Sequence, residues 1–299
     1  MSFFVDNKVT IDYEGLKVAQ QLSATIGYRM ATIELEIHEW NQVNVEDMLT
    51  GCSITGVTDF LNKASIDIST DKGKLEFIEI LSMMREVAHK TVENLSYELK
   101  RNKSKLITTV KPSGTISQLP TVSSGVHYSH APYYIRRIRI SAVDPLSQAL
   151  VESGFKWSPE VGETEENHKI KVFEFPVKAP QGKTKYDVSV IEQLELYKLI
   201  MTHYVDHNAS NTIHVRDGEW DDAKQWIYEN WDDVVGVTFL SLDDNFYQLA
   251  PYETITEEQY EKMISEQPIF DSHILSKFEN FEVEFDLGSD CDSGACPVR

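Results

Sequence analysis

Apolar residues recur along this chain at spacings that predict helices and strands in alternation. Over residues 12–40 they stand four and three apart, which places them on one face of a helix; they are Leu22, Ile26, Met30, Ile33 and Ile37. A second long helix is predicted over residues 74–100, with a stripe that we expect to be buried. Its members are Leu75, Ile78, Leu81, Met84, Ala88, Val92, Leu95 and Leu99.

Short runs rich in β-branched and aromatic residues predict strands between these helices. They are 51–60, 105–111, 133–141, 171–177, "ASNTIHV" and "VVGVTFLSL". Further helices are predicted over 144–153, 189–205, 219–233 and 257–266. Because helices and strands alternate, we expect an α/β fold with mostly parallel strands.

Capping residues fix two of these helices more closely. Asp144 suits an N-cap, Pro145 the first turn, and Gly154 the exit of the same short helix. Thr256 and Gln259 stand three apart before the last helix, which predicts a capping box.

Composition narrows the class of protein and its partners. Among 299 residues, 41% are hydrophobic and 25% charged, as in soluble globular proteins, and the formal net charge is −20. An acidic surface repels nucleic acid polymers and anionic membranes, so we expect neither as a partner. No run approaches the ~18 apolar residues that cross a bilayer, and the start lacks a secretory signal. With three cysteines, we expect a reduced cytoplasmic protein rather than a disulfide scaffold.

The stretch "TTVKPSGTISQLPTVSSGVH", residues 108–127, is unusual because an apolar strand stops at Pro112 and small hydroxyl residues follow. Gly114 lets the backbone approach a ligand closely. Consecutive amide groups in such a turn can converge on an anion. The hydroxyls of Ser113, Thr115 and Ser117 would add donors. The alternative is an ordinary strand-to-turn connection with a helix cap.

Basic residues near this turn are the second feature of the same region. Lys111, Arg136, Arg137 and Arg139 could add positive charge. On an alternating strand Arg137 and Arg139 share one face and Arg136 takes the other, so all three cannot serve one site. We expect at least one of the arginines to be solvated or paired with a carboxylate.

The C-terminal residues "DLGSDCDSGACPVR" carry Cys291 and Cys296 in an acidic, glycine-containing segment that we expect to be mobile. A mobile dithiol can reduce a distant disulfide by thiolate exchange. A tail of ~30 residues reaches ~30 Å as a random coil, which suffices for such a shuttle. Incidental thiols and a metal site are the alternatives.

Other candidate chemistry is weaker. "HYSH" (127–130) and "HYVDH" (203–207) have spacings that metal ligands can use, but no third ligand stands out and we expect no metal site. Cys52 lies in an apolar run, and we expect it to behave as a small buried hydrophobe.

Several segments together resemble one protein family, the adenosylcobalamin-dependent ribonucleoside-triphosphate reductases. They are "TTVKPSGTISQLPTVSSGVHYSHAPYYIRRIRIS", "GCSITGVTDF", "DHNASNTIHV", "ENWDDVVGVTFLSL", "LAPYE" and "CDSGACPVR". The resemblance implies substrate phosphate binding by Ser113, Gly114, Thr115, Ile116 and Ser117. It also implies that Cys291 and Cys296 reduce the active-site disulfide after turnover and are recharged by a thioredoxin-like protein.

The family fold implied by this resemblance is a ten-stranded α/β barrel of two half-barrels. Its cofactor is adenosylcobalamin, whose cobalt–carbon bond breaks homolytically so that a protein thiyl forms and the ribose 2′-OH is replaced by hydrogen. The thiyl cysteine belongs to a finger loop with the motif Asn-Pro-Cys-Gly-Glu, which this chain lacks. We therefore expect residues 1–267 to be the C-terminal half of the catalytic barrel and 268–299 to be a flexible tail.

The missing finger loop also sets the expected partner. Met1 stands about where the family chain continues past that loop, so we expect an enzyme made of two polypeptides that reassemble, with a separated fragment as the alternative. Ribonucleotide reductase activity would then require the N-terminal half, ribonucleotide substrate and reductant. Two other functions stay open: a non-catalytic assembly or regulatory partner of a reductase, and a related radical enzyme with another radical source.

Overall fold

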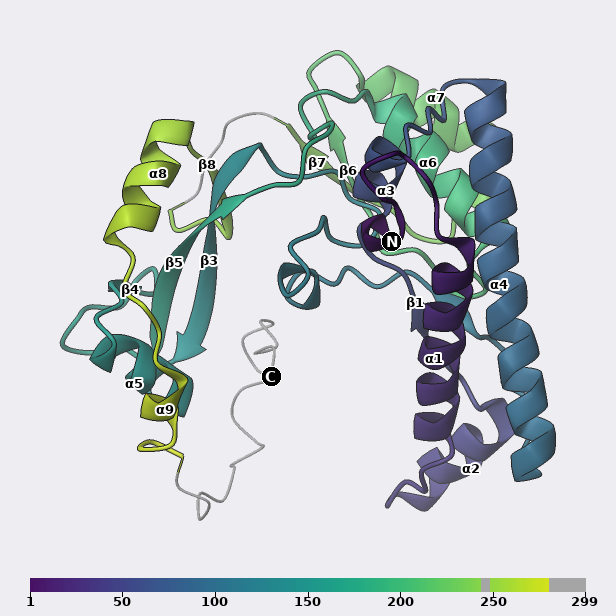
Figure 1. Ribbon diagram of the computed structural model, residues 1–299, viewed down its shortest axis with the longest axis horizontal. Helices are drawn as coiled ribbons and strands as arrows, with labels where there is room; N and C mark the ends of the chain where they lie inside the picture. The colour runs from purple at the N-terminus through teal and green to yellow at the C-terminus, as the bar shows by residue number, and fades with distance from the viewer. Residues whose placement is uncertain (243–247, 280–299) are drawn as a thin grey trace. The chain divides into compact units, whose positions relative to one another are not determined.

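The computed structural model describes residues 1–242 and 248–279, which divide into two compact units. Unit 1 comprises Met1–Ser129 and Pro180–Asp243, and unit 2 comprises His130–Ala179 and Asp244–Arg299. Helices and strands occur in both units, so the chain has an α/β fold (Figure 1). Within the described ranges, no helix combines the length and apolar character that crossing a membrane requires.

The strands of unit 1 are short and parallel. Strand β1 (Cys52–Ser53) pairs with β2 (Thr108–Thr109), and β6 (Thr212–Val215) pairs with β7 (Thr238–Ser241). A parallel bridge between Val110 and Ala209 joins the two pairs, so the segments follow one another in the order β1, β2, β6, β7. Parallel neighbours need crossover connections, and helices occupy all three connections here.

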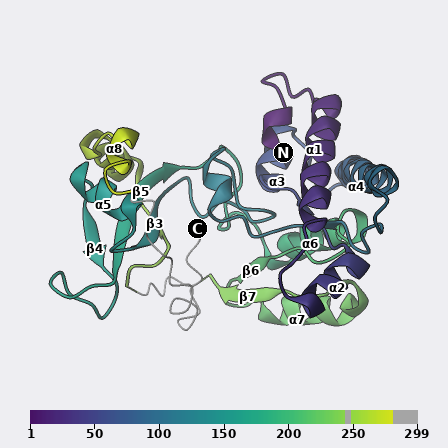
Figure 2. The ribbon, with the colours of Figure 1, turned by 90° about the horizontal axis from the view of Figure 1, so that it is seen from below.

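The helices of unit 1 supply most of its core. They are α1 (Tyr13–Ala31), α2 (His38–Asp47), α3 (Val57–Lys63), α4 (Asp71–Leu99), α6 (Val190–His203) and α7 (Trp220–Glu229). Short 3₁₀ turns lie at Ser2–Phe4 (η1), Ile116–Gln118 (η2) and Trp231–Asp233 (η3). Apolar side chains of α3, α4 and α6 pack in the largest buried cluster, including Phe60, Phe77 and Tyr197. Helices α6 and α7 pack against β6 and β7 (Figure 2).

The two long helices agree with the sequence prediction to different degrees. Helix α4 spans the predicted region, and Leu81, Met84 and Val92 of its predicted stripe are buried, whereas Leu75 and Leu99 at its ends are exposed. The predicted helix over 12–40 is instead two helices, α1 and α2, separated at residues 32–37. Helices α1 and α4 lie side by side (Figures 1 and 2).

Unit 2 is built on an antiparallel sheet in the order β4–β5–β3–β8. Its elements are β3 (Tyr133–Ser141), α5 (Pro145–Glu152), β4 (Trp157–Pro159), β5 (Ile170–Lys178), β8 (Tyr252–Thr254), α8 (Glu257–Glu266) and α9 (Ser272–Leu275). The longest strands among the described residues, β3 and β5, are therefore antiparallel, and the expectation of mostly parallel strands holds only for unit 1. Sequence alternation alone does not fix strand direction, because the long β3–β5 connection returns the chain antiparallel.

Both capping predictions are confirmed in unit 2. The Asp144 carboxylate accepts a hydrogen bond from the amide of Leu146, with Pro145 in the first turn of α5. Thr256 and Gln259 form the reciprocal capping box of α8.

The region expected to form the tail lies partly within the described residues. Phe270 packs edge-on against Phe155 with ring centroids 6.5 Å apart, and the Lys277 ammonium lies 2.6 Å from the Glu152 carboxylate. Residues 268–279 therefore rest on α5 and its neighbours. The rest of the predicted tail lies outside the described residues.

Candidate functional site

The predicted phosphate turn follows β2 directly. Ser113 has a positive φ of 45°, and η2 begins three residues later. The left-handed residue of the bend is thus Ser113, while Gly114 is not among the described residues with positive φ. A non-glycine residue in this region stores backbone strain, which persists only where surrounding contacts hold it.

Four successive amides of the turn, those of residues 113–116, have no protein acceptor among the described residues. The amide of Ser117 donates to the carbonyl of Ser113 and that of Gln118 to Thr115, both at 3.0 Å. The amides of residues 113–116 donate to no acceptor within the described part of the chain. These are the unsatisfied N–H groups expected at the start of a helical turn, and they are available to an anion.

The hydroxyl groups of Ser113 and Ser117 already have protein partners. Ser113 Oγ lies 2.8 Å from Thr55 Oγ1, and Ser117 Oγ lies 3.1 Å from Ser124 Oγ. Thr55 donates to the carbonyl of Ser123, so its single hydroxyl hydrogen is used and Ser113 is the donor between the two. Both serines therefore fix the shape of the turn, whereas Thr115 is exposed.

Gly125 closes the turn at its far end. Its amide is shared between Ser113 Oγ and Thr55 Oγ1, each at 2.9 Å. Its φ is 53°, and a Cβ built here would lie 2.7 Å from the carbonyl oxygen of Lys111. Any other residue would force the two ends of the turn apart, so glycine is required at this position.

Helix α3 holds the segment that follows the turn, around Ser123, through a buried carboxylate. Asp59 Oδ2 accepts a hydrogen bond from the amide of Ser123 at 2.6 Å, and Thr58 Oγ1 lies 2.9 Å from Ser123 Oγ. Burial raises the pKa of Asp59, although its hydrogen bonds to Ser123 partly oppose the rise. Asp59 is therefore a buried acid that supports the turn by accepting a hydrogen bond from Ser123, and it is not a free catalytic group.

His127 ties the same segment to β6. Its Nδ1 lies 2.9 Å from the carbonyl of Ser124, which can only accept, and its Nε2 accepts from the amide of Thr212 at 3.0 Å. These partners select the neutral tautomer with hydrogen on Nδ1. Burial lowers the pKa of His127 and also that of His214, which falls to about 4 with Lys185 and His127 nearby.

The basic residues considered with the turn divide between the two units. Arg137 pairs with Glu174 at 2.7 Å and Glu253 at 2.5 Å, and Arg139 pairs with Glu160. The prediction of salt-bridged arginines is confirmed. Lys111 lies in unit 1 beside the turn, is exposed, and forms no ion pair with any described residue.

Two of the remaining candidates, His207 and Cys52, have structural partners. His207 Nε2 lies 2.7 Å from the carbonyl of Thr50. Cys52 is buried, with its sulfur 3.2 Å from Ser23 Oγ, and burial raises the pKa of its thiol. The expected small, buried role of Cys52 is confirmed. Cys291 and Cys296 lie outside the described residues.

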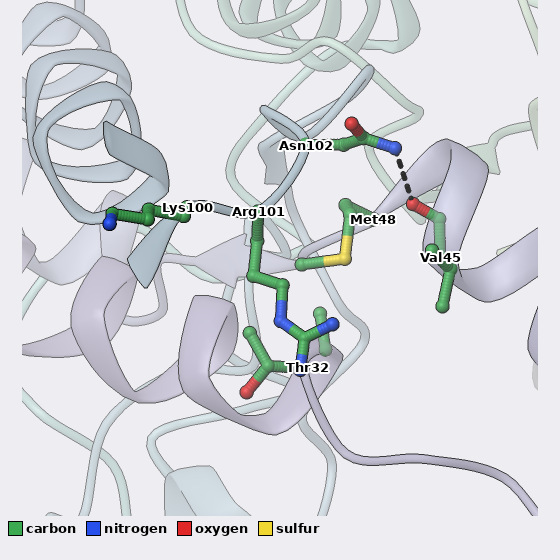
Figure 3. A pocket seen from close by; sticks show the side chains of 7 residues that line it. Thr32, Val45, Met48, Lys100, Arg101 and Asn102 are labelled. Carbon is green, nitrogen blue, oxygen red and sulfur yellow. Dashed lines mark hydrogen bonds between the residues drawn. The ribbon is translucent and has the colours of Figure 1, made fainter. Parts of the chain in front are cut away.

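A small pocket of about 140 Å³ lies elsewhere in unit 1, where α1, α2 and α4 end (Figure 3). Lys100, Arg101 and Asn102 line it, and Asn102 Nδ2 donates to the carbonyl of Val45 at 2.8 Å. Basic side chains beside helix C-termini complement the helix dipoles. The pocket therefore has a structural explanation, and no residue of the turn lines it.

The comparisons with known proteins identify one family of relatives. The adenosylcobalamin-dependent ribonucleoside-triphosphate reductase of Lactobacillus gasseri is 31% identical over 241 residues, which cover 75% of this chain and 30% of that protein. The enzyme of the same name from Levilactobacillus brevis is 32% identical, over 64% of this chain and 26% of that protein. No family model matches the chain.

A solved structure supports the same relationship. A B12-dependent (class II) ribonucleotide reductase superposes with a TM-score of 0.71 and 25% identity, over 90% of this chain and 40% of its own. The chain is homologous to part of an adenosylcobalamin-dependent ribonucleoside-triphosphate reductase. The resemblance stated from sequence is confirmed, and the chain spans about a third or less of the curated reductases named above.

Four residues that support the turn were not assigned to it from the sequence: Thr55, Asp59, Gly125 and His127, the last of which was considered only as a metal ligand. Each acts across a long separation along the chain, so periodicity could not find it. Gly125 follows two serines, and Thr55 and Asp59 flank the start of α3. The sequence does show hydroxyl and acidic residues beside glycines in these two segments. That pattern does not reveal which of the residues contact one another in the folded chain.

The buried acid predicts a pH-dependent stability. Asp59→Asn keeps an oxygen acceptor for the amide of Ser123 but has no charge to bury. Because the folded-state pKa is raised above the ordinary value of 3.8, the folded parent holds a proton that the unfolded chain loses, and the parent loses stability as pH rises. We expect urea unfolding to show that Asp59→Asn gains stability relative to the parent as pH rises above 4, and that the gain levels off once the pH passes the folded-state pKa of Asp59.

Asp59→Ala is the control for that measurement. It leaves the amide of Ser123 without its acceptor and should lower the free energy of unfolding by about 1–3 kcal/mol near pH 4. A parent that instead gains stability over Asp59→Asn as pH rises would contradict the assignment.

Proposed function

We propose that this chain is the C-terminal portion of a ribonucleotide reductase that converts ribonucleoside triphosphates to 2′-deoxyribonucleotides with adenosylcobalamin. Homology to reductases of that name supports this proposal, together with a turn in which four successive amides, of residues 113–116, lack acceptors among the described residues. The turn is the observation on which the substrate role of this chain rests.

The amides of Gly114, Thr115 and Ile116 would bind the substrate phosphates. They are neutral donors, so they bind an anion without a cluster of basic residues on a chain of net charge −20. The exposed hydroxyl of Thr115 and the ammonium of Lys111 could add to them. Ser113 and Ser117 act by holding the backbone in the binding shape.

The parallel strands of unit 1 support a barrel that another body completes. Within the described residues, β1 and β7 each pair on one side only. Unpaired strand edges invite further strands. We assign those strands to the N-terminal portion of the reductase, which would close the ten-stranded α/β barrel and bring the finger loop with its thiyl cysteine.

Adenosylcobalamin would also depend on that portion. The pocket of about 140 Å³ is smaller than the ~300–1,000 Å³ typical of small-molecule sites, and a corrin ring does not fit it. When bound, the cofactor supplies the radical that starts the reaction.

The C-terminal cysteines would return the enzyme to its reduced state. A thiolate of Cys291 or Cys296 attacks the active-site disulfide and forms a mixed disulfide, and the second cysteine resolves it. The active site regains two thiols, while the tail becomes a disulfide with the loss of two electrons and two protons. A thioredoxin-like dithiol then reduces the tail.

Reconstitution tests the proposed function. The chain alone should convert no ribonucleotide, because it lacks the Asn-Pro-Cys-Gly-Glu motif. Adding the N-terminal portion from the same source, adenosylcobalamin and dithiothreitol should produce deoxyribonucleotide, measured by chromatography. Turnover by the chain alone, or none by the mixture, would refute the proposal.

The turn makes a separate prediction within that assay. Gly114→Val places a branched side chain where substrate phosphate must approach, and we expect the KM to rise at least tenfold. Ile116→Val is the matched control, since it leaves every amide in place and should change KM less than twofold. Equal KM values for the two variants would contradict the proposal that this turn binds the substrate phosphates.

The tail is tested by separating one turnover from many. Cys291→Ser and Cys296→Ser should each abolish sustained turnover driven by thioredoxin. Each should leave a single turnover of pre-reduced enzyme intact, measured by rapid quench as product per active site. Equal loss in both assays would show that the pair has another role.

A further inference from the structure

Helix α1 has an apolar face on the side away from its own core. It buries Leu16, Gln20, Ala24 and Tyr28 against unit 1. Its other face carries Val18, Leu22, Ile26 and Met30, whose exposed fractions lie between 53% and 65%. Four large apolar side chains of the helix therefore contact water. We call these four residues the α1 ridge.

The neighbouring helix shows what a solvated face of this unit looks like. The exposed residues in the middle of α4 are polar: Glu79, Ser82, Glu86, Lys90, Glu93 and Asn94. In α1, residues 18–28 include no charged side chain, although a quarter of the whole chain is charged. A contiguous apolar face of this kind marks a contact surface.

We propose that the α1 ridge is the docking surface for the N-terminal portion of the reductase. This inference rests on the proposed function, since it names the surface through which the missing portion binds. The curated relatives extend far beyond this chain, which covers 30% of the Lactobacillus gasseri enzyme. Unit 1, which carries the α1 ridge, also has two strands, β1 and β7, that each pair on one side only within the described residues.

A second copy of this chain could also cover the α1 ridge, but it explains fewer of the observations. Two copies could cover each other's ridges, but each copy would bring the same short parallel strands and no finger loop. The N-terminal portion would account for both features of unit 1. It would supply strands that pair with β1 and β7, and it would supply a surface that covers the α1 ridge. One partner therefore accounts for the apolar face and the open edges together.

The spacing of the ridge defines the chemistry of the partner surface. Its residues stand four apart and form a single i±4 row, which fits the groove between such rows on a second helix. The partner surface should therefore be an apolar helix face with few charges. A basic or acidic partner surface would gain nothing here, because residues 18–28 offer no charge to pair with.

A fluorescent label at Ile26 tests whether the ridge is covered. Ile26→Cys is labelled with bimane in a Cys291→Ser, Cys296→Ser background, where Cys52 is buried and unreactive. Tyr97→Cys, which replaces an exposed residue of α4, carries the control label. Adding the N-terminal portion should shift the emission at position 26 to the blue and reduce iodide quenching several-fold, with little change at position 97.

Charge substitution tests whether the ridge contributes to affinity. Leu22→Asp with Ile26→Asp should weaken binding of the N-terminal portion by at least about 100-fold, because two apolar contacts become buried charges. Ser82→Asp with Tyr97→Asp adds the same charge on α4 and should change Kd less than about threefold. Thermal unfolding of both variants should match the parent, since all four positions are exposed.

The outcomes separate this inference from the proposed function. Complex formation and turnover with an unshielded label at position 26 and an unchanged Kd would overturn the inference alone. A stable dimer of the isolated chain with position 26 already shielded would assign the ridge to a second copy and also overturn it. Absence of any complex and of turnover would remove the proposed function, and this inference with it.

Discussion

The position of the proposed phosphate turn depends on the backbone pairing of residues 107–110, which have neighbours on both sides. Thr108 pairs with Cys52 of β1, and Val110 bridges to Ala209 ahead of β6. Asp206 reinforces this arrangement, because its carboxylate accepts from the amides of Ile107 and Thr108 and from Arg85 and His89. Burial alone would raise the pKa of Asp206, but these donors outweigh it and hold the pKa below its ordinary value.

A fixed strand end allows the turn to keep strained geometry and unused donors. Ser113 adopts a positive φ because Thr55 and Gly125 hold its hydroxyl, and Gly125 in turn lies against Lys111 at the end of β2. The side chains on the inner side of the turn are thus satisfied within the protein. What remains for a ligand is a row of neutral backbone amides, which is how an acidic chain would bind the proposed substrate phosphates.

Sequence reasoning located the local features and missed the long-range ones. Strand β3 matches its predicted residues, and both predicted helix caps are present, because each depends on neighbours a few positions apart. The predicted strand over 51–60 is only β1 followed by α3, since Gly56 at a φ of 66° redirects the chain after two paired residues. Gly125 and Asp59 could not be assigned, because their partners lie more than ten and sixty residues away respectively.

The two faces of α1 show why an apolar pattern does not by itself say what covers it. The face that unit 1 buries includes polar groups with partners, since Gln20 donates to Tyr204 and Tyr28 donates to the carbonyl of Asn102. Those hydrogen bonds make burial of a mixed face possible. The more regular apolar face is then left for another contact. A helix that can be buried on both faces belongs between two layers, and unit 1 provides one of them; the second layer has to come from outside this unit.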